Sequence, residues 1–353
     1  MKKNCFFGNV GFLFLLVFAI SCADDPIERP LGRFERGVLI VNEGAFGAND
    51  GELYHYNPES GEVQANVFEN TNDRPFAGLI QQVREAGELL YLVANTGKVE
   101  IVRGDDLSNV GSVIDPTLQI PRDLVVAGEK LFISDFGPYD EFWNSPESFV
   151  AVVPGKQGGG VSAKISVPSR PEGMALINGR VWVACTSGQS IAVIAPDTEE
   201  VFREIAVPLG APYFFAQHRG NWYLYAVDGS NVYFHRLNPA TFSIAQTIAI
   251  PLANAIYNGN FTLAENGEAF IITASDGESS VAKVSIDEGT VLDAAFFSGS
   301  DFYGLGFDEV SRLLYVGDHA GWQGNGSVWV VNSEGEMTKT IPVGRGPSGF
   351  MFR

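Results

Sequence analysis

Residues 170–194 read RPEGMALINGRVWVACTSGQSIAVI, and this stretch decides the fold. It contains a Pro-x-Gly opening, a short apolar run, an Asn-Gly pair at residues 178–179, a second apolar run and, after a polar loop, a third. Asn-Gly between two apolar runs is typical of a tight β-hairpin, because both residues tolerate the positive φ that the turn requires. The stretch therefore predicts three consecutive antiparallel strands.

The same unit recurs along the chain at intervals of about 41 to 50 residues. Its second strand occupies residues 38–41, 90–93, 131–134, 181–184, 222–225, 269–272 and 314–317. Four short strands per unit at such a period are the sequence signature of a β-propeller, so seven copies predict an all-β fold with seven blades. No window shows a sustained period of 3.6 residues, which disfavours parallel α/β folds.

The two ends of the repeat region complete each other. The first copy begins at its second strand, and residues 346–352 (GPSGFMF) provide the opening strand that it lacks. We therefore expect the N- and C-terminal strands to share one blade, which closes the ring and leaves no sheet edge open. The propeller is predicted to span residues 37–353.

The first residues have the pattern of an export signal. Lys2 and Lys3 precede an apolar run at residues 10–20, which is too short for a bilayer span of about 20 residues. The run ends in Ala19-Ile20-Ser21-Cys22, which resembles a bacterial lipobox with Cys22 as the acylated residue. We predict a lipoprotein signal peptide at residues 1–21, and an acylated Cys22 with a polar tether at residues 22–36. The alternative is an ordinary signal peptide.

Two acids follow the predicted anchor, at Asp24 and Asp25, and resemble the surface-export signal of Bacteroidota lipoproteins. The expected location is therefore the outer membrane, with the protein anchored by lipid and exposed on the cell surface. A chain of 353 residues with 23 basic and 42 acidic residues has a formal charge of −19, which argues against nucleic acid as a partner. Three Cys cannot form a disulfide framework.

Propeller geometry determines the face on which each kind of loop lies. The loops that join second and third strands share one face with the loops that lead into first strands, and this loop face carries the unusual residues. The candidate ligand-binding residues there are Asn42, Phe46, Asn95, Arg122, Phe136, Tyr139, Phe142, Trp143, Arg170, Tyr213, Tyr303, His319 and Trp322. Aromatic residues in long polar loops are hard to explain as core, since loops run over the surface.

Structural explanations of these residues remain open. The aromatic rings of residues 135–144 would also fit a small cluster tucked beneath their own loop. Arg74, Arg122 and Arg170 hold like positions in successive copies, so a repeated ion pair between blades would explain them equally well.

The sequence shows no catalytic constellation. Its four His lie in different copies without metal-ligand spacing, and it has neither Gly-x-Ser-x-Gly nor His-Glu-x-x-His. Asp228, Asp276 and Asp318, which follow second strands, are better explained as turn caps than as cation ligands in the channel. We therefore predict a protein that is not an enzyme and holds neither metal nor cofactor.

The strand Tyr91-Leu92-Val93-Ala94-Asn95 resembles the YVTN repeat of YncE-like propellers. Residues 41–47 (VNEGAFG), followed by Leu53-Tyr54-His55-Tyr56, resemble the opening of a Bacteroidota lipoprotein branch of those propellers, and the resemblance covers residues 37–353. That branch includes BtuG-type surface proteins, which capture cobalamin and pass it to a TonB-dependent outer-membrane transporter. The resemblance implies a binding propeller with such a receptor as its partner.

Three functions follow from these observations. The first is a surface lipoprotein that binds cobalamin or a similar nutrient, because a broad, amide-fringed macrocycle needs flat aromatic contact and neutral hydrogen-bonding groups. The second is a surface scaffold that binds a protein or a glycan. The third is a propeller enzyme such as a lactonase, which the missing catalytic constellation disfavours, although the fold alone does not decide.

Overall fold

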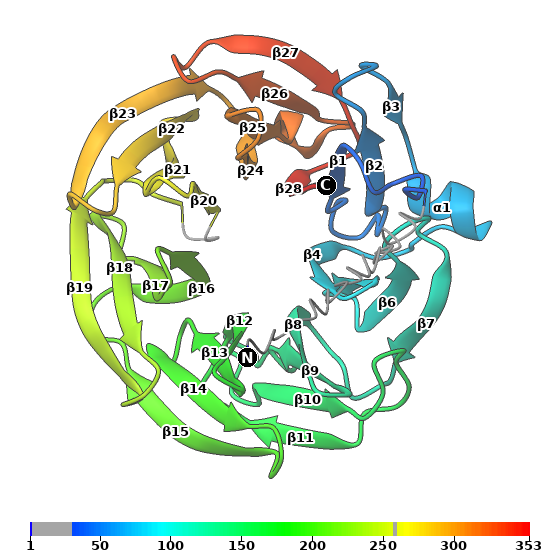
Figure 1. Ribbon diagram of the computed structural model, residues 1–353, viewed down its shortest axis with the longest axis vertical. Coiled ribbons are helices and arrows are strands. Elements are labelled where there is room, and N and C mark those ends of the chain that lie inside the picture. Colours follow the sequence, from blue (N-terminus) through cyan, green and yellow to red (C-terminus); the bar gives the residue numbers. More distant parts are fainter. Residues whose placement is uncertain (2–29, 257–259) are drawn as a thin grey trace. The chain divides into compact units, whose positions relative to one another are not determined.

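The computed structural model describes residue 1, residues 30–256 and residues 260–353. Residues 32–353 form one compact unit, and Figure 1 shows its seven four-stranded sheets arranged as a ring. The predicted seven-bladed β-propeller is therefore confirmed. The predicted signal peptide, Cys22 and most of the tether lie outside the described residues. Within the described residues, no helix has the length and apolar character needed to cross a membrane.

Each blade is antiparallel, with its first strand at the centre of the ring and its fourth at the outer edge (Figure 1). Blade 1 contains β28 (Pro347–Phe352), β1 (Val38–Asn42), β2 (Glu52–Tyr56) and β3 (Val63–Gln64). Blade 2 contains β4 (Ile80–Ala86), β5 (Leu89–Ala94), β6 (Lys98–Arg103) and β7 (Asn109–Ile114). Blade 3 contains β8 (Pro121–Ala127), β9 (Lys130–Asp135), β10 (Phe149–Val153) and β11 (Ala163–Ser166).

The remaining blades follow in chain order around the ring. Blade 4 contains β12 (Pro171–Ile177), β13 (Arg180–Cys185), β14 (Ser190–Ala195) and β15 (Glu200–Ala206). Blade 5 contains β16 (Ala211–His218), β17 (Asn221–Val227), β18 (Asn231–Asn238) and β19 (Ser243–Pro251). Blade 6 contains β20 (Phe261–Leu263), β21 (Glu268–Ser275), β22 (Glu278–Ser285) and β23 (Thr290–Gly299). Blade 7 contains β24 (Phe302–Asp308), β25 (Leu313–Asp318), β26 (Ser327–Val331) and β27 (Met337–Pro342).

Blade 1 closes the ring as the two ends of the sequence predict. Strand β28 pairs antiparallel with β1, with Val38 opposite Phe352 and Ile40 opposite Phe350. Gly37 and Arg353 extend the pairing, since each backbone N–H donates to the other's carbonyl at 3.1 and 2.9 Å. The last strand of the chain therefore holds the first one in place.

The hydrophobic core lies between neighbouring blades. Second strands such as β13 are buried along almost their whole length, because each blade packs against two others. In four copies, the second residue of the second-strand segment is a large ring that is fully buried. These rings are Tyr91, Phe132, Trp182 and Tyr315. These apolar strands provide the burial that holds the blades together.

Blade 1 departs from the four-strand pattern at its outer edge. Strand β3 has only two residues, and the chain continues into the short helix α1 (Val67–Asn72), which the sequence analysis did not predict. The first two residues of this helix, Val67 and Phe68, are buried. The carboxylate of Glu52 accepts hydrogen bonds from the backbone N–H groups of Phe68 at 3.0 Å and Glu69 at 3.2 Å. One buried acid thus satisfies the first turn of the helix.

The end of the predicted tether contacts the propeller. Phe34 is buried, packs into the hydrophobic cluster between blades 1 and 2, and donates its backbone N–H to the Asp105 carbonyl at 3.0 Å. Residues 32–36 therefore belong structurally with the propeller.

Candidate functional site

The two kinds of loop lie at the same face of the propeller, as the topology predicts. Backbone hydrogen bonds join the loop leading into a blade's first strand to the loop after its second strand, as from Phe136 to Ile120 at 3.1 Å and from His319 to Asp301 at 3.0 Å. The same connection occurs in blade 4, from Thr186 to Arg170 at 2.8 Å. Both kinds of loop therefore lie together at one face of the ring.

The long loop of blade 3, residues 136–148, is held by two acids. Asp135 is fully buried and accepts hydrogen bonds from the backbone N–H groups of Gln119, Ile120 and Gly137 at 2.7–3.0 Å. Burial raises the pKa of its carboxyl, against the lowering effect of these hydrogen bonds.

The second acid, Asp140, accepts from the backbone N–H groups of Phe142 and Asn144 at 2.9 and 2.8 Å and closes a tight turn. Hydrogen bonds from Asn144 lower the pKa of its carboxyl. In this turn Trp143 adopts a φ of 62°, a left-handed conformation that costs a non-glycine residue about 1–2 kcal/mol.

Three rings of this loop point into solvent. Tyr139, Phe142 and Trp143 are 40, 74 and 72 % exposed, and the Tyr139 and Trp143 ring centroids lie 5.5 Å apart. In blade 1, Phe46 is 96 % exposed in the loop between β1 and β2. Phe136 alone in this group fits the tucked-under explanation, since it is buried at 7 % exposure.

Blade 7 carries a second aromatic group, made of Tyr303, His319 and Trp322. The His319 and Trp322 rings stack at 4.7 Å, and Tyr303 meets the edge of Trp322 at 5.0 Å. Trp322 lies directly against Gly346, where any Cβ would clash, so the glycine that precedes β28 makes room for the ring. These residues line an open hollow with a volume of about 560 Å³ between blades 6 and 7.

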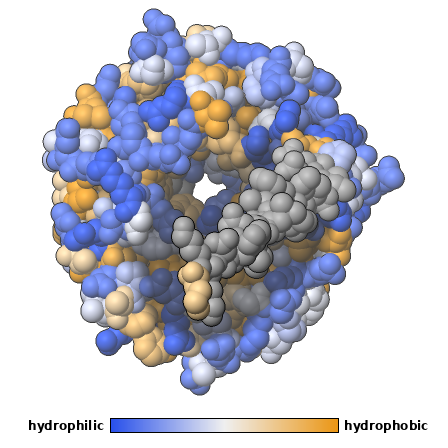
Figure 2. Space-filling view, viewed as in Figure 1, coloured by the Kyte–Doolittle hydropathy of each residue, from blue (hydrophilic) through white to orange (hydrophobic). Residues whose placement is uncertain are grey.

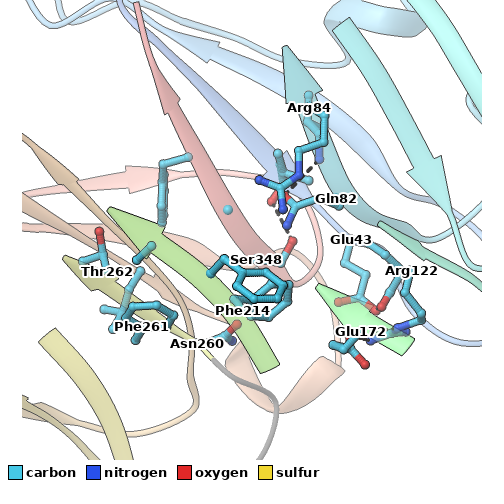
Figure 3. Close-up of a pocket in the computed structure, with 18 of the residues that line it drawn as sticks. Glu43, Gln82, Arg84, Arg122, Glu172, Phe214, Asn260, Phe261, Thr262 and Ser348 are labelled. Atoms are coloured by element: carbon cyan, nitrogen blue, oxygen red, sulfur yellow. Dashed lines mark hydrogen bonds and ion pairs between the residues drawn. The ribbon is translucent and has the colours of Figure 1, made fainter. Parts of the chain in front are cut away.

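The centre of the ring is a channel with a cavity of about 390 Å³ (Figures 2 and 3). Glu43, directly after β1, accepts hydrogen bonds from the Gln81 amide at 2.5 Å and from the Tyr303 hydroxyl. Beside it, the Nε and Nη2 of Arg122 both donate to one oxygen of Glu172, at 3.0 and 2.6 Å. The channel wall therefore contains a connected set of ionisable side chains from four blades.

Burial dominates the electrostatics of this set. Desolvation raises the pKa of the Glu43 carboxyl, although the hydrogen bond from Tyr303 and the nearby Arg122 charge oppose the shift. The pKa of Tyr303 rises well above its usual value because of burial and the adjacent Glu43 carboxylate. A cleft residue perturbed in this way by burial and a specific partner is a candidate functional group.

Ion pairs between blades occur, but not as a regular series. Arg122 of blade 3 pairs with Glu172 of blade 4, as the repeated-pair explanation requires. Arg74 instead pairs with Glu100 of its own blade at 2.8 Å, and Arg170 donates to the Trp143 carbonyl at 2.7 Å.

A second ion pair between blades involves residues that the sequence analysis did not predict. Arg84 of β4 donates to both oxygens of the buried Asp123 of β8, at 2.7 and 2.6 Å.

The predicted site residues thus fall into separate groups. The exposed residues at the loop face are Phe46, Tyr139, Phe142 and Trp143, with Arg170 beside them. The blade 7 group contains Tyr303, His319 and Trp322. Arg122 lies in the channel with Tyr303.

The remaining four predicted residues are more enclosed. Asn42, Phe136 and Tyr213 are buried among protein groups, and Asn95 is half-buried at the end of β5. Asn42 donates to the Glu52 carbonyl at 3.2 Å, and the Phe136 ring supports the Arg122 guanidinium, 4.9 Å away.

The sequence analysis missed Glu43 and Glu172. Both lie in stretches already singled out: Glu43 directly follows β1, the second strand of blade 1, and Glu172 lies in the Pro-Glu-Gly opening of blade 4. An acidic residue in these two segments was the signal that could have identified them. Over the described ranges, no group of three or more His, Cys, Asp or Glu residues is arranged to hold a metal ion.

A family model described as "Domain of unknown function (DUF5074)" matches residues 36–352. The chain belongs to the DUF5074 family. No curated protein matches it in sequence. Solved structures similar to this DUF5074 chain are propellers that share little sequence with it.

One similar structure is the quinoprotein alcohol dehydrogenase-like protein of Bacteroides thetaiotaomicron, with a TM-score of 0.65 and 13 % identity over 90 % of this chain and 78 % of that one. Another is the periplasmic gluconolactonase PpgL of Pseudomonas aeruginosa, with a TM-score of 0.63 and 15 % identity over 89 and 98 %. A third is a candidate 6-phosphogluconolactonase of Bacteroides fragilis, with a TM-score of 0.63 and 14 % identity over 90 and 97 %. At these identities the likeness shows the fold alone.

Proposed function

We propose that this DUF5074 protein binds a large, mostly neutral nutrient on its loop face, and that the nutrient is cobalamin or a molecule of similar size and chemistry. The observation that carries the proposal is the exposure of four large rings, Phe46, Tyr139, Phe142 and Trp143, at one face of the propeller. Exposed aromatic area with polar groups nearby is characteristic of ligand and partner sites.

The backbone at this face supports the proposal. Trp143, Arg170 and Trp322 all have φ between 58° and 62°, in the left-handed region that side chains rarely adopt. The same conformation occurs in hairpin turns elsewhere, as at Arg219, so here it shows only that the surrounding loop holds the backbone in place. Here the Asp140 turn and the bond from Arg170 to the Trp143 carbonyl hold the Trp143 ring outward. A preformed surface limits the ordering cost of binding.

The cellular setting is part of the proposal. The lipobox-like segment ending in Cys22, the acids that follow it and the resemblance to BtuG-type propellers support a surface lipoprotein that passes its ligand to a TonB-dependent receptor. A doubly or triply acylated Cys22 would anchor the protein stably, since each buried CH₂ contributes about 0.8 kcal/mol.

Ligand binding is tested by titrating the purified protein with cyanocobalamin and following tryptophan fluorescence and heat. We expect Trp143→Ser to weaken binding about tenfold or more, because truncating a central aromatic contact costs above about 1.4 kcal/mol. Phe202→Ser is the matched control, since Phe202 is 54 % exposed on the outer strand β15. A folded protein that binds no cyanocobalamin at micromolar concentration would reject the cobalamin assignment.

Anchoring is tested separately, by labelling cells with a radioactive fatty acid and separating their membranes. The wild-type protein should carry label and remain with the outer membrane, whereas Cys22→Ser should carry none and leave the membrane fraction. Equal labelling of both proteins would mean that Cys22 is not the acylated residue.

A further inference from the structure

The channel wall differs on its two sides. Charged and amide side chains from blades 1 to 4 form one side, with Glu43, Arg122 and Glu172 close together (Figure 3). Phe214 of β16 and Phe261 of β20 line the other side together with polar residues of blade 6, and both rings also pack against the core of blades 5 and 6. A molecule in this cavity would therefore meet charged groups along one side and a mixed polar and apolar surface along the other.

The polar side retains hydrogen-bonding capacity that protein does not use. Both contacts between Arg122 and Glu172 involve one oxygen, Oε1. Among the described residues, none donates to Glu172 Oε2 and none accepts from Arg122 Nη1, although the Glu172 side chain is only 10 % exposed. Neither atom is fully buried, so each faces the open channel, and leaving it without a partner costs free energy. Water or a ligand must therefore occupy the positions next to them.

Both arginines of the wall already have counter-charges. Arg84 pairs with Asp123 and Arg122 pairs with Glu172. Glu43 has no cation and accepts hydrogen bonds from the neutral groups of Gln81 and Tyr303. An anionic ligand would therefore find no free cation in the wall, and a buried unpaired charge is costly.

We infer that the channel binds a neutral polyhydroxylated molecule of about monosaccharide size, through the Arg122–Glu172 pair on one side and the Phe214 and Phe261 rings on the other. A hydroxyl group both donates and accepts, so neighbouring hydroxyls satisfy Glu172 Oε2 and Arg122 Nη1 together. The apolar face of a sugar ring would contact those parts of Phe214 and Phe261 that line the cavity. A cavity of about 390 Å³ is within the range of small-molecule sites.

This site is distinct from the aromatic loop surface and does not depend on the proposed function. It uses none of the four exposed rings, and its polar groups lie in first strands or beside them. Figure 2 shows the channel open at the centre of the ring, so a small molecule has a route to it.

The test uses the full chain and saturation-transfer NMR, with calorimetry for any probe that binds. The neutral probes are myo-inositol and the methyl glycosides of glucose, galactose and mannose, and the charged probe is gluconate. We expect at least one neutral probe to bind at millimolar concentration or below, and more tightly than gluconate. Failure of every neutral probe, or tighter binding of gluconate, would overturn the inference.

Glu172→Gln locates the binding. It removes the counter-charge of Arg122, so affinity for the neutral probe should fall about tenfold while affinity for gluconate rises. Glu199→Gln is the matched control, because Glu199 of blade 4 also pairs with a blade 3 cation, Lys130 at 2.7 Å, outside the channel. Equal effects of the two substitutions would contradict the site.

If Glu172→Gln fails to fold, the comparison of probes on the wild-type protein still decides the inference. Trp143→Ser should leave the neutral probe's affinity unchanged. Failure of the cobalamin proposal is therefore distinguishable from failure of this one.

Discussion

Blade 3 contains both a strongly exposed aromatic ring and a fully buried acid. Its loop between β9 and β10 holds Trp143 at 72 % exposure, whereas Asp123 in β8 is fully buried. The Asp123 carboxylate accepts two hydrogen bonds from Arg84 and others from the backbone N–H groups of Leu124 and Met174, both at 2.7 Å. Among the described residues, the Trp143 ring has one ring neighbour, Tyr139.

The comparison separates two roles that one blade performs. Side chains that satisfy each other across first strands hold neighbouring blades in register and contribute to stability. Side chains at the loop face are held by their backbones, and their rings contribute little to folding. Substitution of the buried Asp123 should therefore act on stability, whereas substitutions at the loop face should act on binding.

The largest effect is expected from Asp123→Asn. The substitution leaves Arg84 without its counter-charge and weakens the acceptor for Met174, so the free energy of unfolding should fall by about 3 kcal/mol. This value is the lower end of the range for a broken buried pair, because the Arg84 side chain is 36 % exposed. Urea unfolding followed by circular dichroism measures the change.

The matched control is Asp105→Asn in the other bidentate arginine–aspartate pair, Arg103–Asp105, at 3.0 and 2.6 Å. That pair lies at the surface of a single blade, so its loss should change stability little. If the two variants unfolded at the same urea concentration, the role assigned to the first strands would be wrong.

A smaller effect on stability is expected from Glu52, which is a buried acid without a cationic partner, unlike Asp123. Within the described part of the chain, Glu52 accepts only from backbone N–H groups, and burial raises the pKa of its carboxyl to about 7. Because the folded protein then binds this proton more tightly than the unfolded chain, Glu52 stabilises the fold increasingly as the pH falls through about 7 towards 4.5.

Wild-type protein should therefore gain on the order of 1–3 kcal/mol relative to Glu52→Gln between about pH 8 and about pH 5. The melting temperatures of both proteins across this range measure the difference. Parallel pH profiles would show that Glu52 does not titrate in the folded state above its ordinary pKa.

Sequence reasoning predicted the ring and the composition of its loop face because those follow from local patterns. The repeat period gives the number of blades, and the tail at residues 346–352 gives the closure. Exposure within the 136–148 loop depends instead on which backbone groups Asp135 and Asp140 accept from. The pairing of Arg84 with Asp123 depends on how two different blades align, and no local sequence pattern determines that alignment.

The smallest effect tests whether Trp143 is held outward at a cost to the fold. Trp143→Gly and Trp143→Ala both remove the ring, but only glycine adopts a φ of 62° without strain. The glycine variant should therefore be more stable than the alanine variant by about 1 kcal/mol, and at least as stable as the wild type. Thermal unfolding of the three proteins measures this order, and cyanocobalamin titration of the same samples should show both variants weakened equally. An alanine variant as stable as the glycine variant would mean that the turn relaxes once the ring is gone, so that the backbone does not present the ring.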